Sequence, residues 1–250
     1  MVTPTASDLE YTVTSGPIDC ACVIHGNFYN WDYVTRLHNM LSRHISVGIR
    51  MHVYTESERP VPDTMIKHVL PEWHIGGPKK SWWYKLQIFN TQHHQGPILY
   101  FDLDTVITQN IDWIWQSSLN YFWAIRDFKY LWRPTSVVPN TSVMWFNTVR
   151  FGHVYTDFAN NDINRIMRRL HGDQDYISEV ISQQQRRFFD TNRVKSWRWQ
   201  ALDGGFDFSR RKYHKPGQGT DISDQTSVLI FHGKPKPIDV KDPVILQHWQ

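Results

Sequence analysis

The sequence predicts an α/β fold with a central mixed, mostly parallel sheet flanked by helices. Strand and helix patterns alternate along the first hundred of the 250 residues, which is typical of a parallel sheet covered by helices. The apolar run at residues 98–101 then ends in two acids, Asp102 and Asp104. Because ligands of such sheets bind at the carboxyl ends of strands, the sequence also indicates where a site would lie.

The first hundred residues supply the elements of this sheet in order. We expect a strand at residues 19–25 that breaks at Gly26-Asn27, and a second strand at 47–53 with alternating apolar residues. Between them, apolar residues recur every three or four positions from Trp31 to Ile45, which predicts an amphipathic helix. Residues 56–80 hold many prolines and read as connection, and a helix at 82–92 precedes the acidic strand.

The second half continues with a strand at 142–146, one long helix at 154–170 and a helix that opens at Gly172-Asp-Gln-Asp175. The polar segment 203–225 is expected to close over a bound ligand, and a last strand is expected at 228–231. We expect a polar tail at 1–18 and a single domain at 19–250, in two halves at 19–112 and 113–250.

Composition limits the classes of partner that the protein is expected to bind. A net charge of +3 is compatible with anionic substrates, but it is too small to indicate a surface that binds nucleic acid. We therefore expect no nucleic-acid partner. No apolar run approaches membrane length, and we expect a cytoplasmic protein without a membrane span. Cys20 and Cys22 read as reduced core residues. The chain has 12 tryptophans, whose faces could stack on sugars, but Trp113, Trp115, Trp123 and Trp145 sit in apolar patterns that predict core packing.

The two acids suggest a metal site. Residues i and i+2 of a strand point to the same side, so Asp102 and Asp104 would leave a continuing strand together. Two adjacent carboxylates stay ionised when a hard cation such as Mg²⁺ or Mn²⁺ shares them. A solvated turn is the alternative reading.

Two enzyme classes place such a motif after a strand: nucleotide-sugar glycosyltransferases and haloacid-dehalogenase-like phosphatases. In the phosphatases this strand usually opens the catalytic domain, whereas here about a hundred residues precede it.

Five blocks in order, spread over about residues 20–237, resemble the retaining family 8 glycosyltransferases of the GT-A fold, the type that includes glycogenin and the lipooligosaccharide galactosyltransferases. The blocks are Trp83-Tyr-Lys85-Leu-Gln-Ile-Phe89, Tyr100-Phe-Asp-Leu-Asp-Thr-Val-Ile-Thr-Gln-Asn-Ile-Asp112, Asn140-Thr-Ser-Val-Met144, Gly172-Asp-Gln174 and Phe231-His-Gly-Lys-Pro-Lys-Pro237. The sequence departs from the family pattern at two positions. Ser142 stands where the family has glycine. Gly233 directly follows His232, which leaves open which of Lys234 and Lys236 takes the family's lysine role.

The resemblance implies transfer of a hexose from a UDP-sugar donor to a carbohydrate or a protein- or lipid-linked acceptor, with retention at the anomeric carbon. It implies that the half at 19–112 binds the nucleotide and that the half at 113–250 binds the sugar and the acceptor. It implies that Asp104 and His232 bind Mn²⁺ (or Mg²⁺) and that Asp102 binds the metal or the ribose hydroxyls. The donor would contact His25, Asn27, Tyr29, Lys85, Asp102, Asn140, Gly233, Lys234 and Lys236. Asp173, Gln174 and Lys85 would act at the sugar and its phosphate, by same-face attack or through a covalent intermediate.

Three other functions remain open from the sequence. A dehalogenase-type phosphatase would use Asp102 as nucleophile, with Asp173 or Asp175 as a distal magnesium ligand. A nucleotidyltransferase would need a glycine-rich phosphate loop after the first strand, and Gly26-Asn-Phe28 is a poor one. A non-catalytic carbohydrate-binding domain would have no need of the two acids together with His232.

Overall fold

A seven-stranded sheet forms the centre of the computed structural model, which describes residues 16–73, 78–202, 206–207, 212–213, 219–220 and 222–250. Its strand order is β3-β2-β1-β4-β7-β6-β8. Strands β3, β2, β1 and β4 run parallel, β7 is antiparallel to β4 and β6, and β8 is parallel to β6. The strands are β1 (Ile18–Val23), β2 (Ile49–Thr55), β3 (Ile66–Val69), β4 (Pro97–Phe101), β6 (Phe122–Arg126), β7 (Pro139–Asn147) and β8 (Arg186–Phe188). The predicted α/β fold with a mixed, mostly parallel sheet is confirmed.

Two smaller sheets accompany the main one. A three-stranded sheet has the order β5-β12-β9 and comprises β5 (Thr105–Ile107), β12 (Val228–Ile230) and β9 (Val194–Ser196). A two-stranded sheet pairs β10 (Phe206–Asp207) with β11 (Lys212–Tyr213). The last strand predicted from the sequence therefore exists as β12, but it pairs outside the main sheet. Of the segment expected to close over a ligand, residues 203–205, 208–211, 214–218 and 221 lie outside the described residues.

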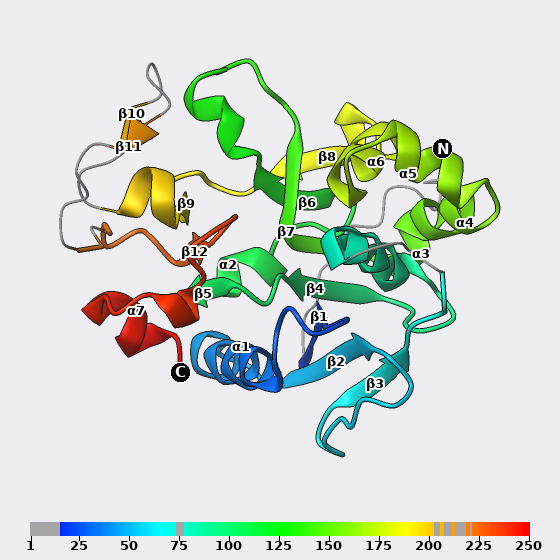
Figure 1. Ribbon diagram of the computed structural model, residues 1–250, viewed down its shortest axis with the longest axis horizontal. Helices are drawn as coiled ribbons and strands as arrows, with labels where there is room; N and C mark the ends of the chain where they lie inside the picture. The colour runs from blue at the N-terminus through cyan, green and yellow to red at the C-terminus, as the bar shows by residue number, and fades with distance from the viewer. Residues whose placement is uncertain (1–15, 74–77, 203–205, 208–211, 214–218, 221) are drawn as a thin grey trace, which may run out of the picture.

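Helices cover both faces of the main sheet. Figure 1 shows α3, α4, α5 and α6 gathered on one side of it and α1 and α7 on the other. The α-helices are α1 (Trp31–His44), α2 (Asp112–Trp115), α3 (Thr148–Phe151), α4 (His153–Ala159), α5 (Ile163–Arg169), α6 (Asp173–Val180) and α7 (Pro243–His248). The 3-10 helices are η1 (Pro78–Phe89), η2 (Phe128–Leu131), η3 (Gln183–Gln185) and η5 (Pro237–Asp239), and η4 (Trp197–Ala201) is a π-helix.

The core follows the alternation of side chains along the central strands. Cys20, Cys22, Leu99 and Phe101 face the cluster that α1 covers, whereas Ala21, Ile98 and Tyr100 face the cluster that η1 and α4 cover. Both cysteines are free and fully buried, as predicted. Of the four tryptophans predicted to pack, Trp145 is fully buried and Trp113, Trp115 and Trp123 are partly buried against the same cluster.

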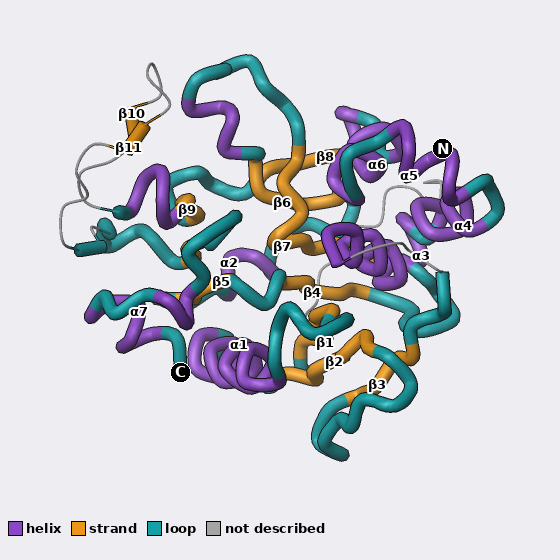
Figure 2. The backbone as a smooth tube through the Cα atoms, in the orientation of Figure 1, coloured by secondary structure: helices purple, strands orange, loops and turns teal. Residues whose placement is uncertain are grey.

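Three expected elements differ from the structure. The long helix expected at 154–170 is two helices, because Asp162 caps a new one by accepting a hydrogen bond from Arg165 N–H at 2.9 Å. The helix expected at 82–92 begins earlier and is the 3-10 helix η1, and strand β3 lies within the stretch expected to be connection. Figure 2 shows the loops that connect these elements. No helix in the described part of the chain is long and apolar enough to cross a membrane.

Candidate functional site

Two adjoining cavities lie where β1 and β4 end. The first has a volume of about 570 Å³ and the second about 510 Å³, and they share Trp82, Lys85 and Asp102. The first is also lined by Val23, His25, Phe28, Tyr29, Ser81, Tyr100, Leu103, Asp104, Gly233 and Lys236. The second is also lined by Lys129, Thr141, Ser142, His171, Gly172, Asp173, Gln174, Asp175 and His232. Both acids predicted from the sequence therefore line the first cavity.

Asp102 and Asp104 reach this cavity from a turn. Strand β4 ends at Phe101, and Thr105 N–H donates to the Asp102 carbonyl at 3.3 Å before β5 begins. Leu103 is buried between the two acids. The strand does not continue through both acids, since the chain turns here and enters a different sheet. The turn nevertheless brings both carboxylates to the same cavity.

Lys85 lies in the wall between the cavities. Its Nζ is 2.9 Å from Asp102 Oδ1 and 3.4 Å from Asp173 Oδ2, and it donates to Thr141 Oγ1 at 3.2 Å. The side chain is only 8% exposed. Burial opposes a charge here, but the carboxylates of Asp102 and Asp173 hold the pKa of Lys85 above its ordinary value. Lys85 is therefore a fixed positive charge that both cavities share.

Asp104 is held from two sides. Tyr29 O–H donates to Asp104 Oδ2 at 2.8 Å, and Lys236 Nζ pairs with the same oxygen. Lys236 also donates to the Phe231 carbonyl at 3.3 Å, which anchors it just beyond β12. The structure thus brings Lys236 into the site, whereas Lys234 is exposed and lies outside both cavity linings.

The charges at this junction favour a further cation. When all five groups are ionised, the carboxylates of Asp102, Asp104 and Asp173 and the ammonium groups of Lys85 and Lys236 sum to −1. Burial raises the pKa of Asp104, although Lys236 opposes the rise, and burial likewise raises the pKa of Asp173. Burial also disfavours ionised Asp102, but Lys85 and the Tyr100 hydroxyl hold its pKa below the ordinary value. A divalent cation between Asp102 and Asp104 would stabilise both in the ionised form.

His232, the third expected metal ligand, faces the second cavity. Its Nε2 is 2.6 Å from Ser196 Oγ, and its ring packs against Phe128 and Trp199. Burial, assisted by the charges of Arg198 and Lys236, lowers the pKa of His232 to about 4, so the imidazole is neutral near pH 7. In the described part of the chain, the one group of three His, Cys, Asp or Glu side chains with ligand atoms within 4.8 Å of each other is Asp19, His52 and His94. The set Asp102, Asp104 and His232 therefore stays a prediction.

Only some of the residues expected at the nucleobase line the first cavity. His25 lines the first cavity and stacks on Tyr84 with ring centroids 4.1 Å apart. Tyr29 lines it too, but its hydroxyl is committed to Asp104. Asn27 is exposed and lies outside both linings. Phe28, which sequence reasoning missed, lines the same cavity with 59% of its surface exposed.

The residues expected at the sugar gather around the second cavity. Thr141 O–H donates to Asp173 Oδ2 at 2.7 Å, and Gln174 Nε2 donates to Asp127 Oδ2 at 2.8 Å. Asn140 instead accepts from Ser142 N–H at 2.9 Å and lies outside both linings. Its neighbours Thr141 and Ser142 line the second cavity in its place.

Trp82 is a further residue that the sequence did not single out for the site. It lines both cavities and is 36% exposed. Gly172 makes room for it, since a Cβ there would lie 2.9 Å from Trp82 Nε1. The glycine has an extended φ of −169°, so the need for space, rather than backbone conformation, favours glycine at this position.

Solved glycosyltransferase structures share this architecture. The glycosyltransferase GlyE of Streptococcus pneumoniae TIGR4 matches with a TM-score of 0.62 at 13% identity, over 88% of this chain and 56% of that one. The galactosyltransferase LgtC, solved in complex with donor and acceptor sugar analogs, matches with a TM-score of 0.55 at 13% identity, over 88% of this chain and 89% of LgtC. The bifunctional glycosyltransferase WbbM matches with a TM-score of 0.57 at 13% identity, over 91% of this chain and 48% of that one.

The chain has a GT-A fold. It spans about half the length of the GlyE and WbbM chains and most of the LgtC chain. Neither a family model nor a curated protein sequence matches it. In this GT-A fold, the two cavities occupy the carboxyl ends of the central strands, where α/β sheets bind their ligands.

Proposed function

We propose that the protein transfers a hexose from a UDP-sugar to a carbohydrate or a protein- or lipid-linked acceptor, in a metal-dependent reaction that retains the anomeric configuration. The observation that carries this proposal is Lys85, which joins a cavity with a pair of acids to a cavity with Asp173. The GT-A fold supports it, and so does the LgtC structure, which holds donor and acceptor sugar analogs.

The first cavity suits the nucleotide. Its volume of about 570 Å³ falls in the range of small-molecule sites. The exposed ring of Phe28 offers a face for the base, and the charged groups Asp102, Asp104 and Lys236 lie along the same cavity, where a diphosphate and its cation would bind.

Asp102 and Asp104 would hold the divalent cation, which would supply Lewis-acid stabilisation of the leaving diphosphate. These carboxylate ligands suit a hard divalent cation, because both are buried and the charged groups around them sum to a net negative charge. The tautomer of His232 that donates Nε2–H to Ser196 leaves Nδ1 with a lone pair for a metal. With the cation bound, Lys236 would be released from Asp104 and could pair with a phosphate oxygen.

The second cavity suits the sugar and the acceptor. Asp173 and Gln174 sit in the first turn of α6, where they can accept from and donate to sugar hydroxyls. The indole of Trp82 offers a face for stacking where the cavities meet. Lys85 would keep Asp173 ionised beside the sugar, where a carboxylate stabilises the positive charge that develops as the diphosphate leaves.

Calorimetric titration of UDP with and without Mn²⁺ tests the proposal. We expect Mn²⁺ to tighten UDP binding at least about tenfold, which corresponds to about 1.4 kcal/mol, and Asp104→Asn to remove this difference. Asp157→Asn, an exposed position on α4, serves as the matched control and should bind like the wild type. Equal UDP affinity with and without Mn²⁺ in the wild type would contradict the proposal. Hydrolysis of an aryl phosphate that Asp102→Asn abolishes would favour the phosphatase instead.

A further inference from the structure

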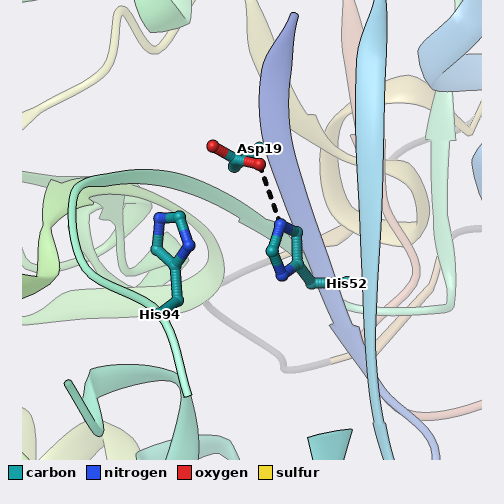
Figure 3. Close-up of side chains that lie close together, drawn as sticks. All are labelled: Asp19, His52 and His94. Atoms are coloured by element: carbon teal, nitrogen blue, oxygen red, sulfur yellow. Dashed lines mark hydrogen bonds and ion pairs between the residues drawn. The ribbon is translucent and has the colours of Figure 1, made fainter. Parts of the chain in front are cut away.

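Histidines gather with one aspartate near the amino ends of β1 and β4. Figure 3 shows Asp19 from β1, His52 from β2 and His94 from the connection between η1 and β4 turned toward one another. One ligand atom from each of the three lies within 4.8 Å of the other two. His68 from β3 packs against His52 with ring centroids 5.1 Å apart.

This cluster is separate from the two cavities. Asp19 precedes Val23, which lines the first cavity, by four positions along β1. At about 3.3 Å per residue, the two residues lie about 13 Å apart along the strand. Asp102 follows the opposite end of β4 from His94, so no ligand atom is shared with the proposed donor site.

We propose that Asp19, His52 and His94 bind a zinc ion. Two imidazoles and one carboxylate are a donor set that zinc favours, with the fourth tetrahedral position left for water. The side chains of Asp19 and His52 are 10% and 5% exposed, so these two ligands are largely shielded from solvent, and His94 is partly buried.

Each proposed ligand already has an outer partner that orients it. His52 Nδ1 lies 2.8 Å from His68 Nε2, and His94 Nε2 lies 3.0 Å from the Pro97 carbonyl. With the His94 proton on Nε2, its Nδ1 is the nitrogen left for the ion, and Figure 3 shows a ring nitrogen of His94 on the side of His52. The guanidinium of Arg50 donates to both oxygens of Asp19, at 2.7 and 2.6 Å, and leaves each a second lone pair. Such outer hydrogen bonds are typical of metal ligands in proteins.

The ion would tie the connection at residues 90–96 to the start of the sheet. This connection joins η1, which carries Lys85, to β4, which leads to Asp102. Zinc that binds the folded state and not the unfolded chain would therefore raise the melting temperature.

Metal titration of the tag-free protein tests the site in the Asp104→Asn background, where the proposed donor site has lost a ligand. We expect one equivalent of Co²⁺ to give a visible absorption spectrum, Zn²⁺ to displace it, and Zn²⁺ to raise the melting temperature. His94→Gln and Asp19→Asn should each weaken zinc binding on the order of 100-fold and abolish the thermal shift. His93→Gln is the matched control, because His93 is the sequence neighbour of His94 and lies outside the ligand group.

Two outcomes would overturn the proposal. One is an unchanged zinc affinity in both His94→Gln and Asp19→Asn. The other is the absence of a bound equivalent in the Asp104→Asn background. Neither outcome bears on transfer from UDP-sugar, because these ligands lie outside both cavities.

Discussion

Lys85 shows how one residue organises this site. Its ammonium group is buried between Asp102 and Asp173 and also donates to Thr141. Removing one partner of such a buried group leaves the others as unpaired charges, which commonly costs about 3–5 kcal/mol.

We therefore expect Lys85→Met to lower the free energy of unfolding by about 3 kcal/mol, as measured by urea denaturation. Adding Asp173→Asn should recover part of this loss, because it removes one of the two stranded carboxylates. Strictly additive effects of the two substitutions would show that the pair is not coupled.

Replacing Asp104 tests its role in transfer separately from its role in the fold. In Asp104→Asn the amide oxygen can still accept from Tyr29, so the fold should persist, but the charge that would hold a cation is lost. We expect transfer from UDP-sugar in Mn²⁺ to fall on the order of 100-fold or more, with far-ultraviolet circular dichroism unchanged. Asp157→Asn should keep full activity, and near-normal transfer by Asp104→Asn would contradict the assignment.

The sequence identified the charged residues of the site better than its aromatic ones. Asp102 and Asp104 follow an apolar run, and Lys236 lies in a motif, so each carried a local signal. Phe28 and Trp82 carried none, because an exposed aromatic side chain in a turn or a 3-10 helix has no apolar periodicity that distinguishes it from a core residue. Asn140 had a motif signal, yet its side chain is engaged with Ser142 N–H.

At the scale of elements, the junction between η1 and α6 depends on one glycine. Trp82 of η1 approaches Gly172, the residue before α6, so closely that a Cβ would lie 2.9 Å from the indole nitrogen. The position of Trp82 in the cavity wall therefore depends on the start of α6, which also carries Asp173 and Gln174.

We expect Gly172→Ala to displace Trp82 or the start of α6 and to lower transfer about 10- to 100-fold, while stability falls by about 1 kcal/mol or less. Gly48→Ala is the control, because its Cβ would meet Pro17 at an ordinary 3.7 Å. Steady-state kinetics and thermal melting separate the two effects. Equal activity in both variants would mean that Trp82 has no role in transfer.

The order and type of most elements follow from the sequence because long periodic segments such as α1 determine them. The exceptions have local causes. Strand β3 has only four residues, and its two apolar residues, Ile66 and Val69, are three positions apart and therefore do not alternate. The break between α4 and α5 depends on one cap, Asp162, within a pattern of apolar residues that continues on both sides of it. The pairing of β12 with β5 depends on contacts between residues far apart in sequence, which local patterns do not encode.

At the scale of the whole molecule, the two cavities predict a stereochemical outcome. Asp173 and Gln174 lie beside the sugar position in our proposal and suit attack from the same face as the leaving group. We expect the first product of UDP-glucose or UDP-galactose, with water as the acceptor, to be the α-anomer. Nuclear magnetic resonance of the anomeric coupling measures this directly. A β-anomer formed first would mean inversion and would overturn the assigned roles of Asp173 and Gln174.

The turn that carries the two acids is also the point where the chain leaves one sheet for another. Asp102 follows β4 of the seven-stranded sheet, and Asp104 precedes β5 of the three-stranded sheet, whose strand β12 leads to His232 and Lys236. A ligand that holds both acids would therefore fasten the two sheets against sliding past each other. Amide hydrogen exchange in β9 and β12 should slow when UDP and Mn²⁺ bind, although neither strand contributes a residue to the first cavity.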